Sequence, residues 1–154
     1  MEELVIAAAI AAAHKDVPGG LLPALHGIQD ALGHIPPESV PLVAGQFNLS
    51  RAEVHGVVSY YHHFRSAPAG RLLVQVCRAE ACKAMGADAL LAHAADRLGC
   101  GVHGTSADGQ CSLEPVFCLG LCASSPAIAV NDAVHARVTP ARFDAIVEEA
   151  RSAA

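Results

Sequence analysis

Four cysteines in two closely spaced pairs constrain this chain more than any other feature. Four residues lie between Cys77 and Cys82, three lie between Cys118 and Cys122, and thirty-five separate the two pairs. Each pair stands where a predicted strand gives way to a loop. Four thiolates on two short loops can hold a binuclear iron–sulfur centre, for instance with each pair on one iron. The spacing therefore predicts one [2Fe–2S] site whose metal and cofactor ligands are Cys77, Cys82, Cys118 and Cys122.

Other sites that use cysteine fit the sequence less well. It contains no Cys-x-x-Cys pair, which disfavours a thioredoxin-type disulfide exchanger and a c-type haem. A Rieske centre is disfavoured because Cys100-Gly-Val-His103 supplies only the second half of its motif. A plant-type ferredoxin needs a third cysteine where this chain has Met85. A structural zinc site on the same four thiolates stays open, because zinc tolerates these spacings.

Two further cysteines, Cys100 and Cys111, are expected to lie outside this site. Cys100 follows a predicted helix of about 16 residues, which places it some 25 Å from Cys82. Cys111 precedes Cys118 by seven residues, roughly 20 Å of extended chain unless Pro115 bends it. We interpret both as small buried apolar side chains, the usual role of a free cysteine.

Charge and hydropathy exclude several classes of protein. The chain has 154 residues, a formal net charge of −5 and 53% apolar residues. This length can bury a core without disulfides, and the acidic balance disfavours a nucleic-acid binder or a polybasic membrane contact. The most apolar run, Leu4–Ala13, has half of the about 20 residues that a membrane span needs, and no positive charge precedes it. We therefore expect a cytoplasmic protein with no membrane span and no nucleic-acid partner. In the reducing cytosol, six cysteines indicate metal binding or catalysis instead of disulfides.

The first part of the chain, residues 1–66, is predicted to form an N-terminal helical bundle. Apolar residues recur at helical spacing in each segment, and Ser50 and Glu53 form a capping box. The expected helices are Leu4–Ala13, Leu21–Leu32, a segment from Pro36 through Phe47, and a segment from Arg51 through Tyr61.

A break in composition at Ser66–Gly70 separates this bundle from a second predicted domain over residues 71–154. Its expected order is β-α-β-β-β-α, a small mixed sheet, which makes the whole chain α/β. Cys82 is expected at the start of its first helix. The expected elements are strand Arg71–Val76, helix Lys83–Leu98, strand Gln110–Glu114, hairpin strands Ala127–Val130 and Ala133–Val138, and a last helix from Pro140 to about Ala150.

The segment Gly99–Gly104 has the letters of a dinucleotide-binding fingerprint in the wrong context. It follows a predicted helix instead of a strand, and no helix opens after it. We interpret it as a helix stop and a loop, so the chain has no convincing site of its own for NAD or flavin.

Several short segments spread over most of the chain resemble those of one known family. They are Cys118-Leu119-Gly120-Leu121-Cys122, Leu25-His26-Gly27-Ile28-Gln29, Gly33-His34-Ile35-Pro36, Ala52–Val57, Tyr60–Phe64, and Asp108-Gly109 with Leu113-Glu114. The family is the thioredoxin-like [2Fe–2S] subunit of respiratory complex I and its relatives in NAD-linked dehydrogenases and hydrogenases. Tyr60 stands where the family commonly has Phe, and Leu121 where it commonly has Ala. The resemblance implies a thioredoxin-like [2Fe–2S] domain after the bundle, one cluster on the same four cysteines, and a non-catalytic electron-transfer role.

The segment Cys77-Arg78-Ala79-Glu80-Ala81-Cys82 looks most like the gamma subunit of soluble, NAD-dependent, molybdenum-containing formate dehydrogenases. That resemblance implies a beta-type partner subunit that binds FMN and NAD, and an alpha-type catalytic subunit that carries the molybdenum cofactor. The alternatives are the equivalent subunit of complex I or of an NAD-reducing hydrogenase, and a zinc-binding assembly subunit. Whether the cluster lies on the main electron path or is a side store stays open.

Overall fold

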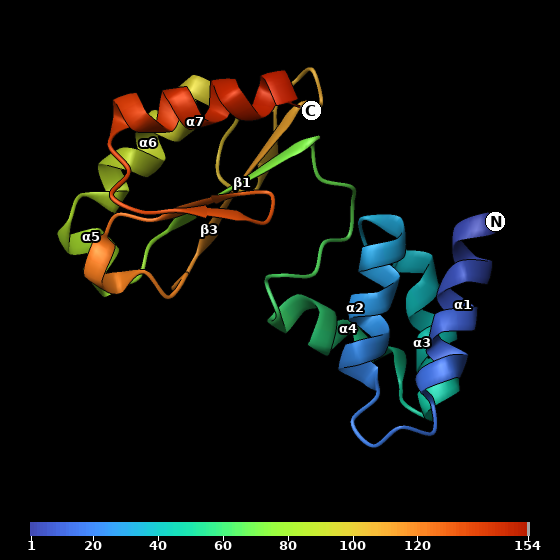
Figure 1. The fold of residues 1–154 in the computed structure, drawn as a ribbon. Helices are drawn as coiled ribbons and strands as arrows, with labels where there is room; N and C mark the ends of the chain where they lie inside the picture. Colours follow the sequence, from blue (N-terminus) through green and yellow to red (C-terminus); the bar gives the residue numbers. More distant parts are fainter. Residues whose placement is uncertain (154) are drawn as a thin grey trace. The chain divides into compact units, whose positions relative to one another are not determined.

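The structure divides into two units, Met1–Pro68 and Ala69–Ala154 (Figure 1). The first unit is built of helices. The structure is a computed structural model, and it describes residues 1–153. The helices of the first unit are α1 (Glu2–His14), α2 (Leu21–Leu32), the 3-10 turn η1 (Pro37–Ser39), α3 (Val40–Phe47) and α4 (Arg51–Tyr60). The sequence predicts that residues 1–66 and 71–154 are separate domains, and this stays a prediction.

Small aliphatic side chains fill the core of this first unit. Leu25, Ile28, Val43 and Val54 are fully buried, and two alanines of α1, Ala7 and Ala11, pack against them without exposure. Alanine lets neighbouring helices approach closely, which suits a bundle with few aromatic residues. The apolar run at the start of the chain therefore serves as a packing face of the bundle.

Local signals in the sequence set the ends of two of these helices. Helix α2 ends at Gly33, whose φ of 77° is the left-handed conformation that glycine adopts easily. Helix α4 begins at the capping box: the Ser50 amide donates to Glu53 Oε2 over 2.8 Å, and the Glu53 amide donates to Ser50 Oγ over 3.2 Å. Donation to the Glu53 carboxylate from the Ser50 amide, and also from the Ser50 hydroxyl over 2.8 Å, holds the pKa of the Glu53 carboxyl below its usual value.

We expect Ser50→Ala to lower the free energy of unfolding by about 1 kcal/mol, the usual loss when a helix cap is removed. Urea denaturation followed by circular dichroism measures it. Ser59→Ala is the matched control, because the Ser59 hydroxyl only bonds carbonyls of its own helix. Equal effects of the two substitutions would contradict a capping role.

The second unit is a five-stranded mixed sheet with helices, which confirms the predicted α/β fold. The strand order is β2-β3-β1-β4-β5; β1 and β3 run parallel, and all other neighbours are antiparallel. The elements are β1 (Leu72–Cys77), α5 (Glu80–Ala84), α6 (Ala87–Leu98), β2 (Gly104–Thr105), β3 (Cys111–Val116), the 3-10 turn η2 (Cys122–Ser124), β4 (Ile128–Val130), β5 (Ala133–His135) and α7 (Pro140–Ala153).

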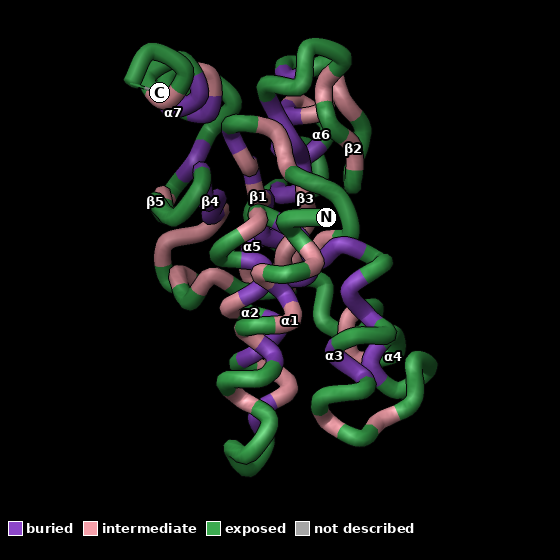
Figure 2. Tube along the Cα trace, turned by 90° about the vertical axis from the view of Figure 1, so that its right-hand side faces the viewer, coloured by how far each residue is buried: buried purple, intermediate pink, exposed green. Residues whose placement is uncertain are grey.

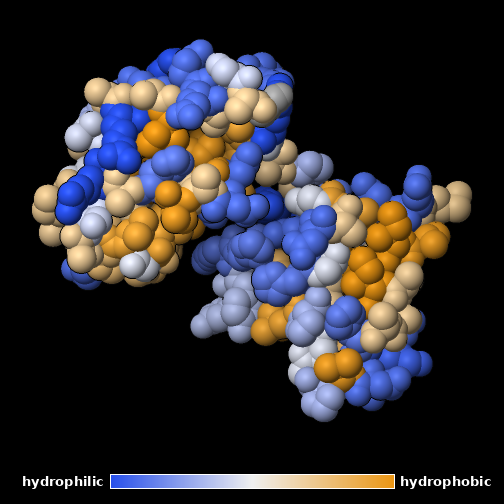
Figure 3. Space-filling model, in the orientation of Figure 1, coloured by the Kyte–Doolittle hydropathy of each residue, from blue (hydrophilic) through white to orange (hydrophobic). Residues whose placement is uncertain are grey.

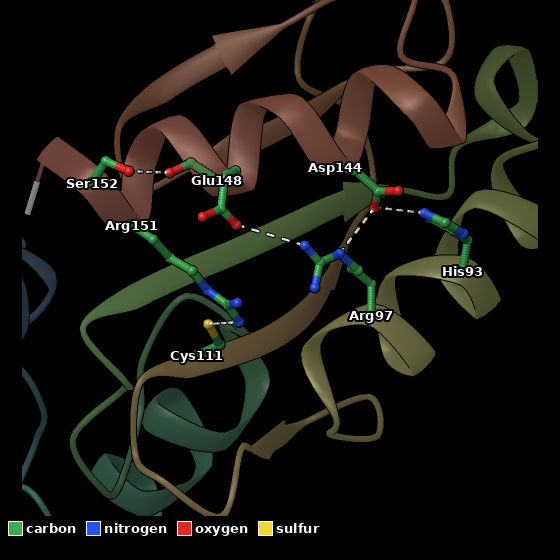
Figure 4. Close-up of polar contacts among 7 residues, drawn as sticks. All are labelled: His93, Arg97, Cys111, Asp144, Glu148, Arg151 and Ser152. Carbon is green, nitrogen blue, oxygen red and sulfur yellow. Dashed lines mark hydrogen bonds and ion pairs between the residues drawn. The ribbon is translucent and has the colours of Figure 1, made fainter.

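The core of the second unit lies between the sheet and the helices α6 and α7. Alternate residues of β1 point into it, and Phe143 of α7 is fully buried there; Figure 2 shows the buried residues following the strands and the inner sides of both helices. Polar pairs link the two helices at the surface, because Asp144 accepts a hydrogen bond from His93 and forms an ion pair with Arg97 (Figure 4).

The predicted helix Lys83–Leu98 is wrong in one respect that matters for the site. The chain forms two helices, α5 and α6, broken at Gly86, which has a φ of 92°. Cys82 consequently lies inside the short helix α5 and not at the start of a long one. The strand β2 was not expected from the sequence.

Within residues 1–153 no helix is both long and apolar enough to cross a membrane.

Candidate metal centre

The two cysteine pairs meet at one edge of the sheet because β1 and β3 are parallel neighbours. Their register pairs Cys77 with Val116, the last residues of the two strands. Parallel strands in register end at the same edge. The chain leaves β1 into Cys82 and leaves β3 into Cys118, so sheet topology brings the two loops together.

The first pair is buried at this edge. Cys77 is 1% exposed and Cys82 is 2% exposed. The Cys77 amide donates to the Ala127 carbonyl over 3.0 Å, which fixes its backbone to the chain before β4. Both cysteines share a small apolar core with Leu119 and Leu121, which lie in the loop of the second pair.

The second pair is exposed, and its sulfurs are close together. Cys118 Sγ and Cys122 Sγ are 3.5 Å apart. Two thiolates at about 2.3 Å from one tetrahedral metal lie about 3.8 Å from each other. The separation of Cys118 and Cys122 thus fits two ligands of one metal ion, whether iron or zinc.

The backbone of the second loop takes unusual conformations at two residues. Cys118 has a φ of 117° and Gly120 a φ of 77°. A non-glycine residue at positive φ is uncommon, and such strain concentrates at functional sites. This conformation aims the Gly120 amide at Cys118 Sγ, to which it donates over 3.3 Å.

That hydrogen bond helps to give the two thiols different pKa values. Donation from Gly120, followed by the contact with Cys122, lowers the pKa of Cys118. The pKa of Cys122 is raised, first by its hydrogen bond to Cys118 and the charge there, and to a smaller extent by Cys82 and Cys77. Cys118 is therefore the thiol of this pair that ionises first.

All four predicted cysteines thus lie at or just beyond the ends of β1 and β3, at the same edge of the sheet, although in two different settings. Cys77 and Cys82 act electrostatically on Cys122, and α5 contacts η2, the turn that begins at Cys122. Among residues 1–153 no three His, Cys, Asp or Glu side chains are grouped around a single metal position. The donor set, four thiols on two loops, fits a centre that divides its ligands between two irons.

The surface around the exposed pair is apolar. Phe117, directly before Cys118, is 68% exposed, and Met85, three residues after Cys82, is 63% exposed. Figure 3 shows hydrophobic side chains on the surface of this unit around α5 and its neighbouring loops. Phe117 and Met85 are thus two large apolar side chains exposed to solvent near the cysteine loops.

Cys111 and Cys100 lie elsewhere in the unit. Cys111 pairs with Leu72, the first residue of β1, so it stands at the opposite end of the sheet from Cys77. Pro115 does not bend β3, which runs on to Val116. Cys111 is fully buried, and Arg151 Nη2 donates to its sulfur over 3.5 Å (Figure 4). Cys100 is half-buried, with its sulfur 4.0 Å from the Cys111 carbonyl oxygen.

The chain as a whole is similar to proteins of a known family. The family model described as "Thioredoxin-like [2Fe-2S] ferredoxin" matches residues 7–151. One of the subunits of an NADH-quinone oxidoreductase of Rhizobium meliloti is 34% identical over 145 residues, which are 94% of this chain and 86% of that protein. The HndA subunit of the NADP-reducing hydrogenase of Solidesulfovibrio fructosivorans is 33% identical over 85% of this chain and 77% of its own length.

A solved structure is similar as well. The NAD+-reducing [NiFe]-hydrogenase in its H2-reduced state matches 86% of this chain with a TM-score of 0.70 and 26% identity. The match covers 22% of that hydrogenase chain, so the similar region is a small part of a longer polypeptide there.

Proposed function

Because the chain belongs to the thioredoxin-like [2Fe–2S] ferredoxin family, we propose that it is an electron-transfer subunit of an NAD-linked oxidoreductase complex. The family implies an iron–sulfur cluster, and we assign its ligands to Cys77, Cys82, Cys118 and Cys122. The position of these four thiols, at or just beyond the ends of two parallel neighbouring strands, carries the assignment. The relatives named above are themselves subunits of such oxidoreductases.

Each residue at the site has a role in this proposal. The thiols must lose their protons to bind iron, and the Gly120 amide favours the thiolate of Cys118. Cys77 and Cys82 hold the buried side, where the apolar surroundings exclude water. When bound, a [2Fe–2S] cluster supplies one-electron transfer, typically at low potential with four thiolate ligands. The exposed side, beside Phe117, faces outward to an electron partner.

The partner that this chemistry suits is a flavin protein. FMN converts the hydride of NADH into single electrons, which a one-electron carrier can accept. We propose that a separate beta-type subunit holds FMN and the NAD site. The location of the complex in the cytoplasm is part of the same proposal.

Within this class of complex, we propose a molybdenum-containing, NAD-dependent formate dehydrogenase. The segment between Cys77 and Cys82, with Arg78 and Glu80, supports this assignment through its resemblance to the gamma subunits of those enzymes. Complex I or a hydrogenase is the alternative, which the names of the relatives support. Purification of the intact complex tests the choice: formate-dependent NAD+ reduction with molybdenum supports it, whereas nickel or quinone-linked activity contradicts it.

Anaerobic purification of the chain alone tests the cluster. We expect a red-brown protein with equal iron and acid-labile sulfide, and after dithionite an S = 1/2 EPR signal, because a reduced [2Fe–2S] centre holds one unpaired spin. Metal analysis and EPR measure both. A colourless protein with stoichiometric zinc would overturn the electron-transfer role and leave a structural metal site.

A further inference from the structure

A cation directly follows each of the two buried cysteines, and both cations contact the same carboxylate. Arg78 follows Cys77, and Lys83 follows Cys82. Arg78 donates from both Nε and Nη2 to Asp88 Oδ1, over 3.1 and 2.9 Å. Lys83 Nζ lies 3.9 Å from the other oxygen, Asp88 Oδ2. Each oxygen of Asp88 thus faces a different cation.

The fold places Asp88 there by breaking the helix at Gly86. Asp88 is the second residue of α6, whose first turn starts immediately after that break. A carboxylate in the first turn of a helix is favoured by the helix dipole. The Arg78 amide donates to the Val116 carbonyl over 2.7 Å, which fixes Arg78 at the edge of the sheet where the cysteines lie.

These contacts bear on the charge around the metal centre. Reduction of the cluster adds one negative charge, so nearby cations favour the reduced state and nearby anions oppose it. Arg78 and Lys83 together bring two positive charges to the loop of the first cysteine pair, and Asp88 offsets one of them. The ion pairs are partly exposed, with the side chains of Arg78, Asp88 and Lys83 at 34%, 56% and 46%, so their contribution to stability is small.

We propose that Asp88 is a positioning residue that holds Arg78 and Lys83 over the first cysteine loop and keeps the reduction potential lower than the two cations alone would set it. This inference rests on the proposed [2Fe–2S] function. On this proposal, Arg78 and Lys83 form ion pairs with Asp88 of the same chain, so they are not a free docking patch for an acidic partner.

The substitution Asp88→Asn removes the charge and keeps an oxygen that can accept from Arg78. At a fixed potential we expect the ratio of reduced to oxidised cluster to rise at least about threefold, which is about 28 mV, because tenfold corresponds to 59 mV for one electron. Redox titration of the purified chain, followed by EPR, measures the shift. It should shrink in high salt, because exposed charges are screened.

Asp96→Asn is the matched control. Asp96 is exposed on the last turn of the same helix and has no ion-pair partner among residues 1–153. The shift in reduction potential in Asp96→Asn should be less than about half that in Asp88→Asn, since the interaction between a side-chain charge and the cluster falls with distance. Equal shifts of the two variants, or no shift in Asp88→Asn, would overturn the proposal.

Two further readouts separate a positioning role from a purely structural one. Asp88→Glu keeps the charge and should return the potential close to that of the unaltered protein. The midpoint of urea unfolding should change little in Asp88→Asn, as expected for partly exposed pairs. A protein without iron contradicts the proposed function itself, whereas an intact cluster with an unshifted potential contradicts only the role of Asp88.

Discussion

Replacing Cys118 or Cys122 by alanine is expected to reduce bound iron and sulfide to less than about a tenth of the unaltered level, because each thiolate is one of four protein ligands to the cluster. The sulfurs of this pair lie 3.5 Å apart on the exposed loop. Alanine there leaves no large cavity, so the fold should survive while the cluster is lost. Iron and acid-labile sulfide analysis, with the visible spectrum, measures the loss.

Cysteine to alanine changes outside the site provide the matched control. Cys100 is half-buried and away from the edge where the four thiols converge, so Cys100→Ala should keep its full iron content. Cys111→Ala should also keep it, with some loss of stability, because Cys111 is fully buried and contacts Arg151. Iron retained in the Cys118 or Cys122 variant, or lost in the Cys100 variant, would contradict the ligand assignment.

The four cysteine ligands could be predicted from the sequence because the two members of each pair lie close together along the chain. Two short spacings predicted two loops. A short β-branched and aliphatic run predicted the first strand, and the turn at Asp108-Gly109 predicted the start of the second. Helix ends were equally readable, since Gly33 and the Ser50–Glu53 capping box are local signals. The parallel pairing of β1 and β3 then brings the two loops together, and that pairing is a property of the whole sheet.

What the sequence could not reveal depends on conformation and on distant contacts. Apolar residues continue at helical spacing from Ala84 through Ala87 to Leu90, so the break at Gly86 did not show in the periodicity, although glycine is a weak helix former. Asp88 is an ordinary surface acid in the sequence, and its importance lies in contacts with residues five and ten positions earlier. The positive φ of Cys118 leaves no mark in the sequence at all.

The site combines a rigid half with a strained half. Cys77 is held by strand pairing and Cys82 by helix α5, and both are buried in the apolar core that they share with Leu119 and Leu121. Cys118 and Cys122 are exposed and depend on the backbone conformation of their own loop. Changes to the second loop should therefore affect the cluster more selectively than changes to the first, which also disturb the core.

Gly120→Val tests this dependence on the second loop. Gly120 has a φ of 77°, and a Cβ built on it meets nothing within 4 Å, so a side chain has room and the cost is backbone strain. For a β-branched residue that strain is about 1–3 kcal/mol. The loop can relieve it only by turning the amide away from Cys118 Sγ, which it now meets at 3.3 Å. Since about 1.4 kcal/mol is a factor of ten in affinity, the lower end of this strain already predicts about fivefold weaker retention of iron.

Gly101→Val is the control for this change. Gly101 is exposed in a loop, also has nothing within 4 Å of a built Cβ, and does not have a positive φ. Loss of the visible spectrum during incubation with an iron chelator, compared between the two variants and the unaltered protein, measures the difference. The EPR line shape should also change in Gly120→Val, because the hydrogen bond to Cys118 is lost. Equal iron retention in both variants would mean that the positive φ of Gly120 and its hydrogen bond to Cys118 do not support the site.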